Sequence, residues 1–141
     1  MAHVELSLWP NVNSGSLELW GFAVAMASEP CVVLDGDGLV VAASPGCGQL
    51  LGFDPVESVG LRLVDEVLRL LDFNTVSGEL RGWEVDVIPP LLAIRSGGLA
   101  RGLVRISGGA GGGASTVDAV STPLKQDGEV VGSLTFFNPV P

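Results

Sequence analysis

The chain has 141 residues, of which 47% are hydrophobic, and it carries a formal net charge of −9. That length predicts one domain with a single core, and the apolar content excludes a disordered chain. The negative charge and the scattering of the seven basic residues argue against binding to nucleic acid or to an anionic membrane surface.

Histidine and cysteine are too scarce for most metal or disulfide chemistry. The single histidine, His3, argues against a histidine triad, a zinc site or a haem ligand. Cys31 and Cys47 are expected to be small buried residues in a reducing cytosol. No secretory signal pattern is present, and the longest apolar stretch, from Leu19 to Ala27, is shorter than the ~20 residues that span a bilayer. We therefore expect a cytoplasmic protein.

The N-terminal part predicts an arm followed by a helix. Residues 1–13 are expected to be extended, and a helix is predicted from Ser14–Ser16 to about Ser28, before Pro30. Its residues from Leu17 to Met26 are apolar almost all the way round, so this helix needs cover on two sides.

The middle of the chain predicts a hairpin and several short helices. Residues 31–34 and 39–42 are rich in β-branched residues and flank the turn Asp35–Gly38. Ser44 is predicted to cap a helix that ends at Gly52, and from Asp54 the pattern stays helical, with Val64, Val67, Leu68 and Leu71 on one side. Residues 74–82 are predicted to be a loop, and Pro89 opens a further helix that Gly97 closes.

The last third predicts three strands, over residues 101–107, 116–124 and 129–138. A glycine-rich loop at 108–113 joins the first two, and Asp127-Gly128 joins the last two. The order predicts an α+β fold, a five-stranded antiparallel sheet with short helices on one face and an additional N-terminal helix. Residues 1–28 would form the arm and flanking helix, and residues 29–141 the domain proper.

Several short segments occur in the order and spacing typical of one family. They are Glu29–Gly38, Leu50–Phe53, Val59–Leu63, Val120–Leu124 and Val131–Leu134. In these segments the chain resembles the PAS family of sensor domains, as a single-domain member. The resemblance implies a PAS-like, profilin-like sheet and a non-enzymatic role in signal transduction or regulation of transcription, through protein–protein interaction. It also implies homodimerisation and a partner such as a kinase, phosphatase or transcription factor. The chain either acts through such partners or is an excised input domain.

The resemblance also bears on cofactors. Flavin-binding photosensors of this family have a cysteine in the helix that follows Gly60, where this chain has Leu61–Val64, and a polar amide on the last strand, where the strand phase places Leu134. Haem-binding members supply a histidine from the region that corresponds to Trp83–Ile94, which has none. We expect neither cofactor. Asp35–Gly38 lacks the further ligands of a calcium loop, so no metal is expected.

The predicted sheet and helices share an apolar face that is either a filled core or a pocket for a hydrophobic small molecule. The candidate residues are Val67, Leu68, Leu71, Leu91, Leu92, Ile94, Val104, Ile106, Val117, Leu134 and Phe136. Arg101 and Arg105 with Asp118 could hold a ligand carboxylate or form a solvated pair across strands.

The alternative is a small isomerase-like enzyme that acts on an apolar substrate. It would need a buried carboxylate with a raised pKa, for which Asp86 and Asp118 are the candidates. The predicted strand phase points Asp118 outward, which favours the non-enzymatic interpretation.

The N-terminal helix also predicts a homodimer. If one of its sides covers the outer sheet face, another side stays exposed unless a second subunit covers it. The candidate interface residues are Leu17, Trp20, Phe22, Ala23, Val24, Met26, Leu103, Val131 and Phe137.

Overall fold

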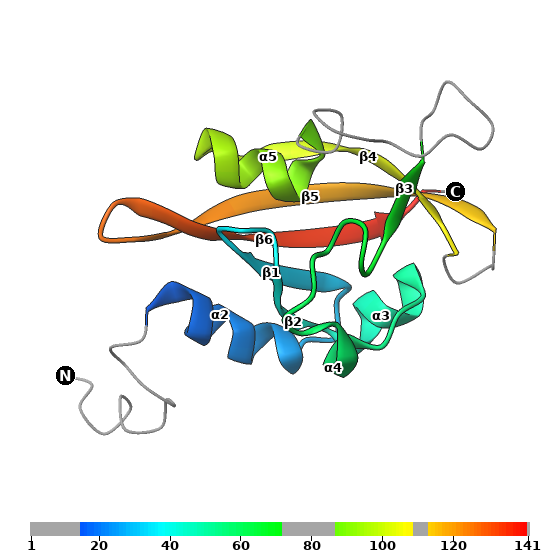
Figure 1. The fold of residues 1–141 in the computed structure, drawn as a ribbon, viewed down its shortest axis with the longest axis horizontal. Coiled ribbons are helices and arrows are strands. Elements are labelled where there is room, and N and C mark those ends of the chain that lie inside the picture. Colours follow the sequence, from blue (N-terminus) through cyan, green and yellow to red (C-terminus); the bar gives the residue numbers. More distant parts are fainter. Residues whose placement is uncertain (1–14, 72–86, 109–112, 141) are drawn as a thin grey trace.

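A computed structural model describes residues 15–71, 87–108 and 113–140 (Figure 1). The predicted loop 74–82, most of the glycine-rich loop, the arm at 1–13 and Asp86 lie outside the described residues. The strands are β1 (Cys31–Asp35), β2 (Val40–Ala43), β3 (Arg69–Leu71), β4 (Ala100–Ser107), β5 (Ala114–Gln126) and β6 (Glu129–Pro139). The helices are α2 (Ser16–Ala25), α3 (Pro45–Leu51), α4 (Pro55–Ser58) and α5 (Pro89–Ser96).

The strands form one antiparallel sheet in the order β2-β1-β6-β5-β4-β3. This confirms the predicted α+β fold, with six strands where five were expected. The extra strand is β3, which pairs with β4 through Leu70 opposite Ile106. The long hairpin β5–β6 turns at Asp127-Gly128, as predicted.

Ser44 is the local reason why the hairpin β1–β2 leads directly into α3. Its Oγ accepts hydrogen bonds from the backbone N–H of Cys47, at 3.1 Å, and of Cys31, at 3.0 Å. The same hydroxyl donates to the carbonyl of Glu29 at 2.6 Å. The helix ends at Gly52, whose φ of 82° is left-handed. The predicted helix from Ser44 to Gly52 is therefore confirmed.

The predicted continuation of helix from Asp54 through Leu71 was wrong beyond Ser58. Gly60 and Asp65 have φ angles of 87° and 83°, which no right-handed helix contains. The chain forms isolated bridges instead, such as that between Val64 and Leu68, before it enters β3. Val64, Leu68 and Leu70 are still buried, so this irregular path satisfies the apolar pattern that had suggested a helix.

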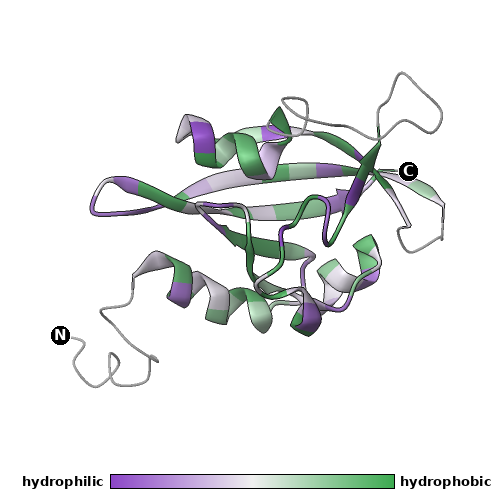
Figure 2. Ribbon diagram, viewed as in Figure 1, coloured by the Kyte–Doolittle hydropathy of each residue, from purple (hydrophilic) through white to green (hydrophobic). Residues whose placement is uncertain are grey.

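The sheet has two differently covered faces. The inner face carries Val104, Ile106, Val117 and Phe137 and packs against residues of α3, α5 and the segment that leads to β3. The outer face carries Val33 and Leu134, which pack beneath Val24 of α2. Figure 1 shows α5 and α2 on opposite sides of the strands, and Figure 2 shows hydrophobic residues in α2 and in the strands it covers.

Candidate interaction surfaces

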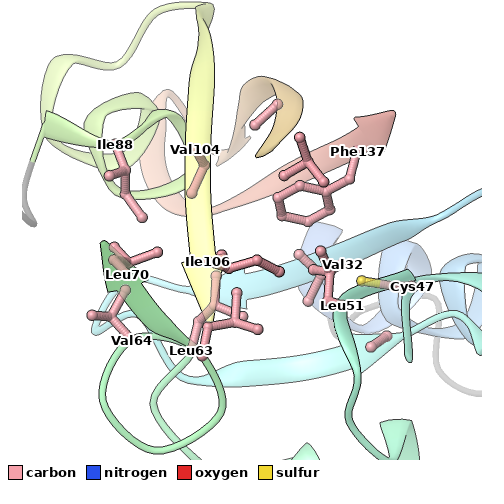
Figure 3. Close-up of a cluster of buried hydrophobic side chains, with 14 of the residues drawn as sticks. Val32, Cys47, Leu51, Leu63, Val64, Leu70, Ile88, Val104, Ile106 and Phe137 are labelled. Atoms are coloured by element: carbon pink, nitrogen blue, oxygen red, sulfur yellow. The ribbon is translucent and has the colours of Figure 1, made fainter. Parts of the chain in front are cut away.

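The inner face is a packed core of buried side chains (Figure 3). Its members lie in the six described strands, in helix α3, in the segment that leads to β3, and at Ile88 immediately before α5. They are Val32, Leu34, Val40, Ala43, Cys47, Leu51, Leu63, Val64, Leu68, Leu70, Ile88, Val104, Ile106, Val117, Ala119 and Phe137. Of the predicted pocket residues, Leu68, Val104, Ile106 and Val117 belong to this core, and Val67, Leu91 and Ile94 pack against it.

The other predicted pocket residues lie elsewhere, because the phase of β6 was wrong by one residue. Phe137 points into the core and is 2% exposed, whereas Leu134 packs beneath α2 and Phe136 is 39% exposed. Two consecutive phenylalanines leave the apolar pattern of this strand ambiguous, and the sheet resolves it by turning Ser133 and Thr135 inward. Leu71 and Leu92 also lie outside the inner core cluster.

No local sequence pattern indicated the hydroxyl groups that accompany this core. Ser121 Oγ and Thr135 Oγ1 share a buried hydrogen bond of 2.6 Å between neighbouring strands. Ser133 Oγ donates to the carbonyl of Pro90 at 2.9 Å and thereby attaches β6 to α5. Because each hydroxyl has a partner, these groups cost little stability in an apolar environment.

Among the described residues, the buried polar side chains are all serines and threonines, and none is a carboxylate. Asp118 lies on the outer face and accepts a hydrogen bond of 2.7 Å from Arg101. The guanidinium lowers the pKa of Asp118, whereas the isomerase alternative needs an acid with a raised pKa. Asp118 therefore has the solvated cross-strand pairing rather than the environment of a buried catalytic acid.

Both cysteines are buried and free. Burial raises the pKa of Cys47 to about 12, and burial also raises the pKa of Cys31 despite its hydrogen bond with Ser44. Both side chains are therefore protonated thiols near neutral pH, which are poor nucleophiles and poor metal ligands. Over residues 15–71, 87–108 and 113–140, no group of three or more His, Cys, Asp or Glu side chains is placed to hold a metal ion.

Helix α2 lies across the outer face and covers only part of it. Its inward side packs on Cys31, Val33, Ala42, Leu124 and Leu134. Gly21 allows close approach, because a Cβ there would lie 3.0 Å from a methyl carbon of Val41. The rest of the outer face forms two exposed apolar surfaces, one along each side of α2.

The first surface is the β2 groove, a hollow of about 780 Å³ between α2, the edge strand β2 and the helices α3 and α4. Its lining is mostly apolar and comes from four elements, α2, β2, α3 and α4, and from the segments that join or follow the two short helices. The lining residues are Glu18, Gly21, Phe22, Ala25, Val41, Ala42, Ala43, Pro45, Gly48, Gln49, Phe53, Pro55, Val56 and Val59. Val56 and Val59 are exposed by 82% and 52%. No local sequence pattern indicates this groove, because its residues come together only through the packing of separate elements.

The second surface is the β5 patch, which we define as Trp20, Leu103, Val120 and Phe136. The three large side chains Trp20, Leu103 and Phe136 are 44%, 54% and 39% exposed. Val120 lies opposite Phe136 on the neighbouring strand. Trp20 is two residues from Phe22 and is not part of the groove lining, so it lies on the other side of α2. Because the groove lies on the side of the edge strand β2, this other side of α2 faces β6 and β5.

The residues predicted for the dimer interface fall into two groups, those exposed on the surface and those buried or half-buried in the fold. Trp20, Phe22, Ala23, Met26 and Leu103 are exposed and remain candidates. The placement of Phe137 on the outer face was wrong, and Val24 is buried against the sheet. Leu17 and Val131 are half-buried beside the same cluster, so they support the docking of α2 rather than face a partner.

Within the described segments, no helix has the length and apolarity needed to cross a membrane.

Comparison with known proteins identifies the fold. No family model matches the chain, and no curated protein matches it. A PAS domain from Colwellia psychrerythraea superposes with a TM-score of 0.60 at 16% identity, over 88% of this chain and 96% of that chain. A PAS domain from a two-component sensor histidine kinase gives a TM-score of 0.59 at 16% identity, over 98% and 100%.

The light-state LOV domain of the blue-light photoreceptor Aureochrome1 gives a TM-score of 0.60 at 22% identity, over 84% of this chain and 87% of that chain. The chain has a PAS fold.

Proposed function

We propose that the chain is a non-enzymatic PAS-type sensory or interaction module that acts through self-association and a signalling partner. The observation that carries this proposal is the contrast between a filled inner face and two exposed apolar surfaces beside α2. The similar folds include a domain of a sensor histidine kinase and a domain of a photoreceptor, which supports a role in signalling. The proposed partner is accordingly a kinase, a phosphatase or a transcription factor.

The proposed self-association uses the β5 patch. In a dimer with a two-fold axis, the β5 patch of one copy packs against the β5 patch of the other, so no second apolar surface is needed. Each large side chain buried there would contribute about 1.5–3 kcal/mol. The ion pair between Arg101 and Asp118 lies beside Leu103 and Val120 and gives the patch a polar border, as interfaces usually have.

The packing of the inner face supports a module without flavin or haem. Leu134, which the strand phase had placed opposite a flavin ring, lies beneath α2 on the outer face, so that placement was wrong. The three inward residues of the same strand are Ser133, Thr135 and Phe137, and their side chains already have partners or fill the core. The proposal therefore assigns signalling to surface contacts.

Light-scattering chromatography of the full chain tests the proposal. We expect the wild type to elute with the mass of two chains at tens of micromolar, and Trp20→Glu to elute with the mass of one. Leu99→Glu is the matched control, because Leu99 is 73% exposed and lies outside both surfaces. A wild type that is already monomeric, or equal effects of both variants, would refute self-association through the β5 patch.

A further inference from the structure

The β2 groove combines an apolar lining with an acidic border. Glu18 is the single charged residue among its lining residues. Asp54 and Glu57 flank the lining residues Pro55 and Val56, and both are exposed. The chain as a whole carries a net charge of −9, so its long-range field adds to the local one. Both the local acidic residues and the long-range field favour an occupant that carries positive charge at the margins of an apolar surface.

The shape of the groove favours a helical segment over a small molecule. The hollow is open to solvent between α2 on one side and α3 and α4 on the other. Small-molecule sites usually enclose about 70–90% of the ligand surface, which an open groove does not do. An amphipathic helix needs only its apolar stripe to be buried, and its polar side stays in water.

The charge distribution also argues against a second copy of this chain as the occupant. The longest helix of a second copy, among the described residues, is α2, whose single charged residue is Glu18. Two copies would then bring acidic borders together, and like charges in such proximity weaken association.

We propose that the β2 groove binds an amphipathic helix of a partner protein, with basic residues along the borders of its apolar stripe. This rests on the proposed function only in that the chain is an interaction module. It uses the side of α2 opposite the β5 patch, so it does not depend on self-association.

The first experiment maps the site by NMR with isotope-labelled full-length protein. The probe is a designed peptide of leucine and lysine at helical spacing, and the control peptide has glutamate in place of every lysine. We expect amide shift changes to cluster at Phe22, Gln49 and Val59, and only with the lysine peptide. Shift changes centred elsewhere, or equal responses to both peptides, would overturn the proposal.

The second experiment separates apolar docking from plain charge attraction. Val56→Glu places a charge in the apolar wall at a position that is 82% exposed, so the fold should tolerate it. We expect it to weaken the affinity for the lysine peptide at least about tenfold. Leu99→Glu adds the same charge outside the groove and should leave the affinity unchanged or slightly stronger. An equal effect of the two variants would overturn the proposal.

The third experiment tests the acidic border through a pair of neutralising variants. Glu18→Gln should weaken binding several-fold and reduce its salt dependence, because it removes an attraction at the groove. Asp37→Asn removes an equal charge from the turn between β1 and β2 and should have no such effect. If both variants act equally, only the net charge matters and the groove has no specific role.

Two further outcomes would assign the groove to a different occupant. If Val56→Glu converts a dimer into a monomer, a second copy occupies the groove. If freshly purified wild type carries an added mass in native mass spectrometry that Val56→Glu lacks, a small molecule occupies it. Either result would overturn the partner-helix proposal. Failure of Trp20→Glu to affect self-association would bear on the proposed function alone.

Discussion

The inner and outer faces of the sheet are both apolar, but only the inner face is closed. On the inner face, Leu63, Ile106 and Phe137 are at most 2% exposed. On the outer face, Leu103 and Phe136 are 54% and 39% exposed although they share a sheet face with the buried Leu134, and Trp20 of α2 is 44% exposed. A single short helix cannot cover six strands, so the uncovered remainder is available for contacts. The comparison teaches that the larger buried core of this chain lies on the inner face, whereas exposed apolar side chains remain on the outer face, where we propose the interaction surfaces.

The adjacent residues Phe136 and Phe137 offer the largest test of that comparison. Phe137→Ala removes a buried ring from the core and should lower the free energy of unfolding by about 3–5 kcal/mol. Phe136→Ala removes an identical ring from the outer face and should cost well under half as much. Urea unfolding of both variants measures the difference. Equal losses would mean that the two faces are equally closed.

Gly132 tests how closely β6 packs against β1 and against α2. A Cβ at this position would meet the backbone carbonyl of Leu34 and lie 2.7 Å from a methyl carbon of Leu17 in α2. Gly132→Ala should therefore destabilise the protein by about 1–3 kcal/mol, the usual cost of overpacking. Thermal unfolding followed by circular dichroism measures it.

Gly113→Ala is the control for that variant, because a Cβ at Gly113 has no atom within 4 Å. It should leave the melting temperature nearly unchanged. If Gly132→Ala were as mild as Gly113→Ala, the close packing of β6 against both β1 and α2 would be refuted.

The smallest expected effect concerns the ion pair beside the β5 patch. Arg101 lowers the pKa of Asp118 in the folded chain. The ion pair therefore stabilises the fold at pH values above the ordinary pKa of Asp118, and this stabilisation is lost as the pH falls through the lowered pKa. Arg101→Gln should return the pKa of Asp118 toward its ordinary value of 3.8. An NMR titration of the carboxyl carbon measures it, with Arg95→Gln on α5 as control. An unchanged pKa in Arg101→Gln would show that the pair does not form in solution.

Local patterns predicted most of the fold because each had its own physical cause. Ser44 before Pro45 predicted a capped helix, and the hydroxyl of Ser44 indeed accepts the N–H of Cys47. Gly97 predicted the end of α5, where it adopts a left-handed φ of 71°. Asp127-Gly128 predicted the hairpin β5–β6, which has the longest register of paired residues in the described sheet, with ten positions from Val117 to Gln126.

The errors arose where one pattern fits two structures. Val64, Val67, Leu68 and Leu71 have helical spacing, but the left-handed backbone at Asp65 interrupts any helix between them. The extra strand β3 depends on pairing with β4, a contact distant in sequence. The phase of β6 depends on whether Phe136 or Phe137 faces the core, and only the packing of both sheet faces decides that.

The two surfaces were predictable to different degrees. Trp20 and Leu103 could be named, because an all-round apolar helix beside an apolar sheet leaves some side chains exposed. The β2 groove could not, since Phe22, Gln49 and Val56 come together only through the packing of α2 against β2 and of α4 beside it.

The central claim is that the outer face beside α2 is the working surface of this PAS fold, and a solvent-exposure measurement tests it most directly. NMR spectra with a soluble paramagnetic agent, recorded at low and high protein concentration, report the exposure of individual side chains. We predict that Trp20, Leu103 and Phe136 become shielded as the concentration rises, whereas the exposed Leu99 does not and the core residue Ile106 is protected throughout. Equal exposure of Trp20, Leu103 and Phe136 at all concentrations would contradict the account.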